Sequence, residues 1–289
     1  MQIQEAIAAL ERFAPLPLQE SYDNAGLQIG LTGSKCSGAL LCLDVTEDVI
    51  AAAAQRGCNL IVSHHPLLFR GLKRIGDDGY VERCVRRAII ATSPEFPEDS
   101  TGITIYSAHT NLDNAPSGVN FEIASRLGLE DVKFLDPISS PRSATRMGDA
   151  CLSKNGGGWE GAAGSGVIGR LPHPVPAMEF LAEVKRTFGV EALAYTRGPQ
   201  TEVQTVALCG GSGAFLTDKA ARQGADVFLT GEMDYHRSFG YERSLWLAAL
   251  GHYESERFTI QLLHRILAEA CPTLRIEEYE PTTSPVHYM

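Results

Sequence analysis

Apolar runs of strand length alternate with segments of helical spacing along the first part of the chain. Residues 39–45 (ALLCLDV) and 59–63 (NLIVS) have the character of buried strands. Between them, Thr46 is expected to cap a helix over residues 49–55. A strand, a helix and a second strand in this order form a crossover unit, whose two strands run parallel. The first part of the chain therefore predicts an α/β fold built on a largely parallel sheet.

The same patterns predict the remaining elements. Helices are expected at residues 1–14, 81–92, 118–127, 178–188 and 254–271. Strands are expected at residues 103–108, 167–171, 192–195, 203–209, 226–230, 246–250 and 274–279. Proline and glycine become frequent after residue 130, so residues 130–201 are predicted to form a smaller second α/β unit. Residues 1–129 plus 202–289 then form the larger, metal-binding domain, and the Gly-rich run 155–166 is expected to be a surface loop.

Composition and charge exclude several classes of function. The chain has 289 residues, of which 44% are hydrophobic and 21% charged, as in a globular protein with a substantial core. A net charge of −10 and the lack of a basic run argue against sequence-independent binding to nucleic acid. No apolar run reaches membrane-spanning length, and the N-terminus lacks the pattern of a signal peptide. Seven cysteines without a C-x-x-C pair predict free thiols in a reducing cytoplasm.

Histidines and acidic residues follow directly after three of the predicted strands. They are His64 and His65 after residues 59–63, His109 and Asp113 after residues 103–108, and His252 and Glu256 after residues 246–250. The spacing of His252 and Glu256 is that of one helix face. The carboxyl ends of neighbouring parallel strands open on one edge of a sheet, where ligand sites are built. If the three strands are parallel neighbours, all these side chains meet at that edge.

Each fragment also has an ordinary explanation. Adjacent histidines in a loop commonly make simple hydrogen bonds, and His109 with Asp113 suits a turn network. The pair His252 and Glu256 suits a surface ion pair. The joint pattern favours metal ligation, because every cluster follows an apolar strand. Imidazole with carboxylate suits Zn, Fe, Mn, Co or Ni, and five or six such ligands fit two ions that share a carboxylate better than one catalytic zinc.

Two loops in the last third of the chain offer candidates for substrate binding. Residues 210–213 (GGSG) lie between a predicted strand and a helix, where backbone N–H groups can hold a phosphate. This loop lacks the P-loop lysine, so a tight turn is an equal explanation. Glu232 also follows a strand, and it is either part of a pocket or a solvated loop residue. From these loops we take Gly211, Ser212 and Glu232 as candidate substrate-binding residues.

Seven segments resemble those of a known family. In order along the chain they are YDNAGLQIG at 22–30, SHHPLLF at 63–69, YSAHTNLD at 106–113, GSGVIGRL at 164–171, VALCGGSGAFL at 206–216, ADVFLTGEM at 225–233 and GHYESE at 251–256. Together they make the sequence similar to the GTP cyclohydrolase I type 2 homologs, also called Nif-three-like or YbgI-like proteins. The resemblance covers nearly the whole chain. It implies two interlinked α/β domains with mixed, largely parallel sheets, which is the Nif-three-like fold.

The resemblance also implies a dinuclear metal site. By that likeness, His65 and Asp113 serve one divalent ion. His64 and His252 serve the other, and Glu256 bridges the two. The expected ions are Zn, Fe or Mn.

The likeness places His109 close to the ions, as a supporting neighbour or a proton carrier. His109 and Glu256 are therefore the candidate catalytic residues. Family members are similar in forming toroidal hexamers, so a homohexamer is expected.

The function implied is that of a metal-dependent hydrolase acting on a nucleotide or a cyclic amidine, as in opening of the GTP purine ring. A phosphoesterase is a related possibility. The alternative from a different class is a non-catalytic metal-binding ring protein with an interaction or regulatory role. The fold and the metal site do not by themselves fix a substrate.

Overall fold

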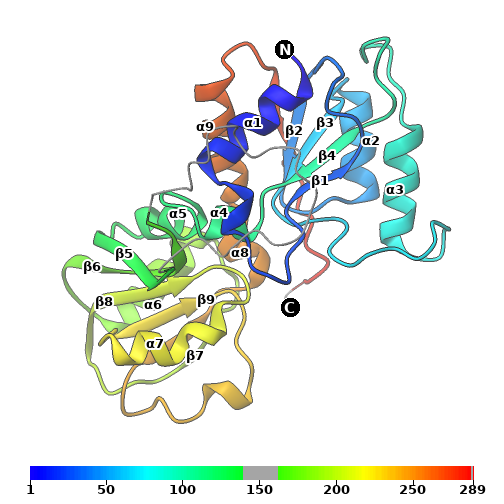
Figure 1. Cartoon of the computed structure of the whole chain (residues 1–289). Helices are drawn as coiled ribbons and strands as arrows, with labels where there is room; N and C mark the ends of the chain where they lie inside the picture. Colours follow the sequence, from blue (N-terminus) through cyan, green and yellow to red (C-terminus); the bar gives the residue numbers. More distant parts are fainter. Residues whose placement is uncertain (139–161, 288) are drawn as a thin grey trace. The chain divides into compact units, whose positions relative to one another are not determined.

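Two β-sheets, one of five strands and one of six, divide the chain into two units. A computed structural model describes residues 1–138, 162–287 and 289. Unit 1 consists of Met1–Leu112 with Thr259–Pro285, and unit 2 consists of Asp113–Phe258 with Val286–Met289. Most of unit 1 is coloured from blue to cyan in Figure 1, and most of unit 2 from green to orange. The predicted mixed α/β fold with two sheets is confirmed.

Unit 1 is built on the five-stranded sheet, in the order β1-β4-β3-β2-β11. The strands β4, β3, β2 and β11 run parallel, and β1 pairs antiparallel with β4 at the edge. The strands are β1 (Gly26–Ile29), β2 (Ala39–Cys42), β3 (Leu60–Ser63), β4 (Thr104–Ser107) and β11 (Ile276–Glu278). The helices are α1 (Ile3–Phe13), the 3-10 helix η1 (Leu16–Leu18), α2 (Glu47–Gln55), α3 (Tyr80–Ile90), α4 (Thr110–Asp113), whose last residue begins unit 2, and α9 (Thr259–Ala270).

Helices cover both faces of this sheet. Figure 1 shows α2 and α3 on one side and α1 with α9 on the other. Ile61 and Ile105, from neighbouring strands, belong to one buried cluster with Val49 of α2 and Val85 of α3. All four residues of β2, β3 and β4 are buried, and such continuous runs are typical of parallel strands covered on both faces. The ends of these strands are therefore held in a closely packed frame.

Unit 2 is built on the six-stranded sheet, in the order β5-β6-β8-β9-β10-β7. The strands β8, β9 and β10 run parallel, whereas β5, β6 and β7 pair antiparallel with their neighbours. The strands are β5 (Glu130–Pro137), β6 (Gly164–Pro176), β7 (Ala194–Thr196), β8 (Glu202–Cys209), β9 (Val227–Thr230) and β10 (Trp246–Ala249). The helices are α5 (Val119–Arg126), α6 (Ala177–Phe188), α7 (Thr217–Arg222) and α8 (His252–Glu256), with 3-10 helices η2 (Gly213–Leu216) and η3 (His236–Ser238).

The sheets group part of the chain differently from the sequence pattern. The pattern predicts that residues 202–289 belong with residues 1–129, but β8, β9 and β10 share hydrogen-bonded pairing with β5, β6 and β7. The chain returns to unit 1 only at Thr259. The helix predicted over residues 254–271 is accordingly two helices, α8 and α9, which are separated by Arg257 and Phe258.

Two strands are not anticipated by the sequence pattern. β1 lies within a polar segment punctuated by glycine, and β5 (EDVKFLDP) is an edge strand with mostly exposed or half-buried residues. Neither strand shows the continuous apolar run that marks the central strands. The Gly-rich run 155–166 was expected to be a surface loop. Its residues 155–161 lie outside the described part of the chain, and β6 begins at Gly164.

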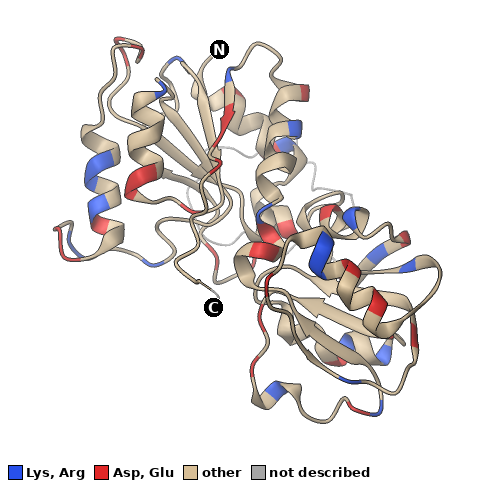
Figure 2. Cartoon of the chain, turned by 180° about the vertical axis from the view of Figure 1, so that it is seen from behind, with Lys and Arg blue, Asp and Glu red and all other residues tan. Residues whose placement is uncertain are grey.

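Charged side chains of unit 1 pair across its helices. Figure 2 shows basic positions along α3 and acidic positions at the start of α2. Glu47 contacts Arg83 at 3.0 Å and Arg87 at 2.9 Å. The basic face of α3 is therefore partly neutralised by this unit's own acids. Among the described residues, none of the helices is both long enough and apolar enough to cross a membrane.

We predict that the central strand of unit 1 is a major determinant of its stability. Ile61 is fully buried in β3, so Ile61→Ala should lower the free energy of unfolding by about 2–5 kcal/mol. Ile90, at the end of α3, is 70% exposed, and Ile90→Ala should change the free energy of unfolding by about 0.5 kcal/mol or less. Urea denaturation of the two variants measures the difference. Equal losses would contradict the assigned burial.

Candidate metal centre

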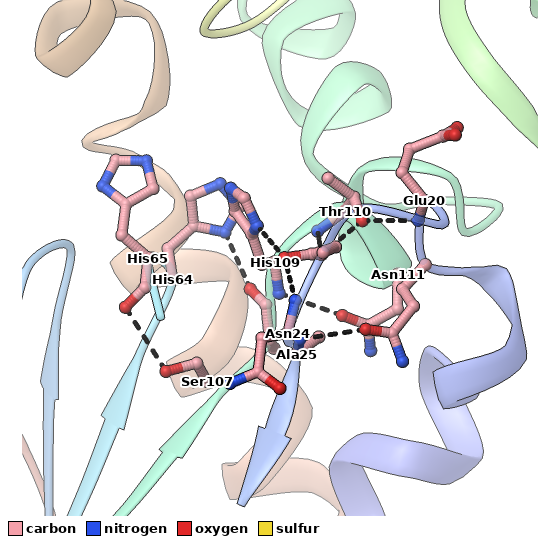
Figure 3. A network of polar contacts seen from close by, with 12 residues as sticks. Glu20, Asn24, Ala25, His64, His65, Ser107, His109, Thr110 and Asn111 are labelled. Carbon is pink, nitrogen blue, oxygen red and sulfur yellow. Dashed lines mark hydrogen bonds and ion pairs between the residues drawn. The ribbon is translucent and has the colours of Figure 1, made fainter. Parts of the chain in front are cut away.

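The carboxyl ends of three neighbouring parallel strands in unit 1 are followed by imidazoles and a carboxylate. Asp44 follows β2, His64 and His65 follow β3, and His109 follows β4. The register aligns the last residues of the three strands, so these side chains start from one edge of the sheet. Figure 3 shows the histidines close together at the ends of their strands. Parallel pairing thus brings together residues that are far apart in the sequence.

The three histidines of unit 1 form a tight cluster. The ring centroids of His64 and His65 are 4.9 Å apart, and the ring of His109 lies 5.3 Å from His64 and 5.6 Å from His65. One nitrogen of each ring lies within 4.8 Å of the corresponding nitrogens of the other two. His64 is fully buried, and the other two are half-buried. Neutral imidazoles at this spacing are suitable ligands for a divalent ion.

Hydrogen bonds fix which nitrogen each ring presents. His64 Nδ1 lies 2.8 Å from the carbonyl oxygen of Ala108. A carbonyl only accepts, so this ring carries its proton on Nδ1 and the lone pair of the neutral ring is on Nε2. His65 Nδ1 and His109 Nδ1 each lie 2.7 Å from a carboxylate oxygen, of Asp44 and of Asp23 respectively. All three rings are thus oriented as in a metal site, where the ring nitrogen that does not bind the metal is held by a hydrogen bond.

The two supporting carboxylates are stabilised as anions. Burial alone would raise the pKa of Asp23, but hydrogen bonding and charge from His109, with hydrogen bonds from Thr110 and Asn24, lower it. Burial likewise opposes ionisation of Asp44, and contacts with His65 lower its pKa. A carboxylate that accepts from Nδ1–H holds the ring and increases the basicity of Nε2.

The parallel strands of unit 2 end in a second set of ligand-type residues. Glu232 follows β9, and His252 follows β10 and begins α8. His252 Nδ1 lies 2.8 Å from Glu232 Oε1, and its Nε2 lies 3.1 Å from Glu256 Oε2. The predicted one-face arrangement of His252 and Glu256 is confirmed. Ser212 Oγ donates to Glu232 Oε2 at 2.7 Å, which orients the supporting carboxylate and lowers its pKa.

Asn120 links Asp113 to the loop that follows β8. Its side-chain amide donates to the backbone carbonyl of Asp113 at 3.1 Å, and its amide oxygen accepts from Gly210 N at 3.0 Å.

Burial, with the charges of Asp113 and Glu256, raises the pKa of the Cys209 thiol. Glu256 is 4% exposed, so unit 2 contains a buried carboxylate beside an oriented imidazole.

Gly211 allows the loop after β8 to approach Glu256 closely. Its φ is +56°, a left-handed conformation that glycine adopts without strain. A Cβ built on this residue would collide with Glu256 Oε1 and would lie 3.3 Å from His252 Nε2. The absence of a side chain here therefore leaves room for both ligand-type groups.

The six residues singled out from the three strand ends are divided between the two units. Unit 1 contains His64, His65 and His109, and unit 2 contains Asp113, His252 and Glu256. The condition that the preceding strands are neighbours in one sheet is met by β3 and β4. It is not met by β10, which pairs with β9 in the second sheet. The hydrophobic pattern identifies a buried strand but does not identify its partner.

Sequence reasoning missed the carboxylates that hydrogen-bond to Nδ1 of the histidines. Asp44 follows β2 in the same way as the histidines follow β3, and this signal was available in the sequence. Asp23 lies 86 positions from His109 and has no local pattern that relates the two. Glu232, a candidate for substrate binding, contacts His252 through its carboxylate.

The two units, with imidazoles and carboxylates at the ends of their parallel strands, define an α/β protein with the ligand types of a divalent-metal site. The family model described as Duf34/NIF3 (NGG1p interacting factor 3) matches residues 1–285. The chain therefore belongs to this family, and the family resemblance seen in the sequence is confirmed.

Two similar bacterial proteins are named GTP cyclohydrolase 1 type 2 homolog. The protein of Clostridium perfringens is 30% identical over 259 residues, which are 89% of this chain and 87% of that protein. The protein of Clostridium acetobutylicum is 27% identical over 271 residues, which are 93% of this chain and 91% of that protein. The crystal structure of a Bacillus cereus protein related to NIF3 has a TM-score of 0.82 at 23% identity, and the match covers 100% of this chain and 99% of that chain. This likeness supports the fold.

We predict that Gly211→Ala destabilises the protein more than Gly224→Ala does. Both glycines have positive φ, +56° and +74°, so each substitution should cost about 1–2 kcal/mol of backbone strain. Only the Cβ at position 211 meets Glu256, whereas the one at position 224 has no neighbour within 4 Å. The free energy of unfolding from urea titration separates the two effects. Equal losses would show that Gly211 serves only its turn.

Proposed function

We propose that the two groups together hold two divalent metal ions, drawn from Zn, Fe and Mn. His65 and Asp113 serve one ion. His64 and His252 serve the other, and Glu256 bridges both. The observation that carries this proposal is the hydrogen bond at Nδ1 of His64 and of His65, which directs the Nε2 lone pair of each ring away from its partner. In unit 2, His252 Nε2 lies 3.1 Å from Glu256 Oε2. Imidazole nitrogen with carboxylate oxygen is a donor set that suits these ions.

Asp113 and Glu256 lie close in sequence to the two points at which the chain passes between the units. His109 ends the unit 1 group and Asp113 begins unit 2, with α4 spanning the crossing. Four residues extend to at most about 14 Å, and as a helical turn they rise about 6 Å. At the other crossing, Glu256 lies close in sequence to Thr259, where unit 1 resumes. Ligand-type residues of unit 2 are thus attached to unit 1 by short links at both crossings.

We further propose that the protein is a metal-dependent hydrolase acting on a nucleotide or a cyclic amidine. The relatives named GTP cyclohydrolase 1 type 2 homolog support this substrate class. When bound, a pair of divalent ions lowers the pKa of water and stabilises negative charge that develops on the substrate. His109, whose Nδ1 is held by Asp23, accepts a proton at Nε2 and returns it during the reaction. Gly211 and Ser212 border the substrate.

The proposal includes a toroidal homohexamer in the cytoplasm. The family resemblance supports the ring. The cysteines support a reducing compartment, because those within the described ranges are free thiols, namely Cys36, Cys42, Cys58, Cys84, Cys209 and Cys271. Light scattering of the purified protein tests the assembly, and a monomer would remove this part of the proposal.

We predict two metal ions per chain, with different losses in different variants. Because Glu256 bridges, Glu256→Gln should remove most of both ions, whereas His64→Ala should leave about one. Elemental analysis after reconstitution with Zn²⁺ or Mn²⁺ and removal of excess metal measures both. His173→Ala is the matched control, since His173 is exposed, and it should retain both ions.

Two outcomes would change the assignment. Full occupancy in both His64→Ala and His252→Ala would refute the ligand set. Loss of only one ion in Glu256→Gln would indicate separate sites in the two units rather than a bridged pair. Circular dichroism of each apo variant shows whether the fold is retained.

We predict that the metal-loaded protein releases formate from GTP or a related cyclic amidine. His109→Ala should lower kcat by about 100-fold or more while two ions remain bound, because proton transfer by a positioned side chain contributes this much. Formate and phosphate are measured in parallel with Mn²⁺, Fe²⁺ and Zn²⁺. Loss of metal in His109→Ala would indicate that His109 is a metal ligand rather than a proton carrier.

The products distinguish the function classes. Release of phosphate without formate would indicate a phosphoesterase. If the loaded protein converts neither nucleotides nor cyclic amidines, the hydrolase proposal fails, and the non-catalytic metal-binding ring protein becomes the better description.

A further inference from the structure

The last strand of unit 1 carries the chain back to the edge of the sheet where the histidine cluster lies. β11 pairs parallel with β2, and Tyr279 N extends this pairing by donating to Leu41 O at 2.8 Å. Because the pairing is parallel, the residues after β11 leave the sheet at the end where Asp44 follows β2. The segment from Glu280 to Pro285, which belongs to unit 1, therefore starts beside the support of His65.

Thr283 makes a specific contact at this edge. Its Oγ1 donates to Asp44 Oδ2 at 2.5 Å, and the other carboxylate oxygen, Oδ1, accepts from His65 Nδ1 at 2.7 Å. Each oxygen of Asp44 thus has one of these two partners. The three side chains form a continuous series of hydrogen bonds from the last segment of unit 1 to a candidate metal ligand.

A comparison with Asp23 shows why Asp44 depends on this contact. The Asp23 side chain is completely buried, and its carboxylate also accepts from Thr110 and Asn24. The Asp44 side chain is 36% exposed, and within the described structure its side-chain hydrogen bonds are those with His65 and Thr283. An exposed carboxylate held at one oxygen can rotate into water, and a second hydrogen bond restricts that rotation.

We propose that Thr283 is a positioning residue of the metal centre, which holds Asp44 so that His65 keeps Nε2 directed at its ion. This inference rests on the proposed function, and it adds a residue of the last segment to the site. The hydroxyl is the group required, since only Oγ1 contacts Asp44. Loss of a partner that orients a ligand typically weakens metal binding by about 10–100-fold.

The test compares Thr283→Val, which has the same shape without the hydroxyl, with Thr283→Ser, which retains it. Binding of Co²⁺ is followed by competition with a chelator and by the visible spectrum of the bound ion. Thr283→Val should weaken one of the two ions by about tenfold and shift its spectrum, while Thr283→Ser restores wild-type binding. Thr101→Val, at an exposed threonine, is the control and should bind both ions as the wild type does.

A second comparison tests the route through Asp44. In the Asp44→Ala background, Thr283→Val should have no further effect on Co²⁺ affinity, because the residue it holds is absent. An additional loss in that background overturns the proposal. So does unchanged Co²⁺ binding in Thr283→Val, or equal weakening of both ions with a lower melting temperature of the apo protein. Failure of the wild-type protein to bind Co²⁺ would instead refute the metal site itself.

Discussion

The candidate site depends on the hydrogen bond that each histidine makes at Nδ1. A neutral imidazole has one lone pair, and the partner of the protonated nitrogen decides which nitrogen presents it. His64 uses a backbone carbonyl, which is fixed by the end of β4. His65, His109 and His252 use carboxylates, which both orient the ring and make its other nitrogen more basic. A histidine without such a partner would lose rotational freedom on binding an ion, and this loss would weaken the binding.

Each unit positions its own ligand-type residues with the same element of topology. Three parallel strands lie side by side in each sheet, β2, β3 and β4 in one and β8, β9 and β10 in the other. The residues that follow these strands supply an imidazole, a carboxylate or a glycine turn. Because register aligns the strand ends, short loops suffice to bring these groups together, and the packed strands limit their movement.

The sequence was informative where chemistry and structure are local. His64 and His65 follow an apolar run directly, and His252 with Glu256 repeats at the spacing of one helical turn, so both were recognised. The sequence does not indicate which sheet β10 joins, because an apolar run is compatible with any buried position in either sheet. The edge strand β5 was missed because its exposed residues dilute the pattern.

The supporting residues were harder to find than the ligands, and the reason is their distance in sequence. Asp23 reaches His109 across 86 positions and Thr283 reaches Asp44 across 239. No periodicity relates such pairs, because they become neighbours only when the sheet of unit 1 is complete. The contact of Thr283 further requires that the chain has passed through unit 2 and returned as β11. The orientation of His65 is therefore coupled to completion of the fold, and an incompletely assembled unit 1 would have the histidine without the geometry that makes it a ligand.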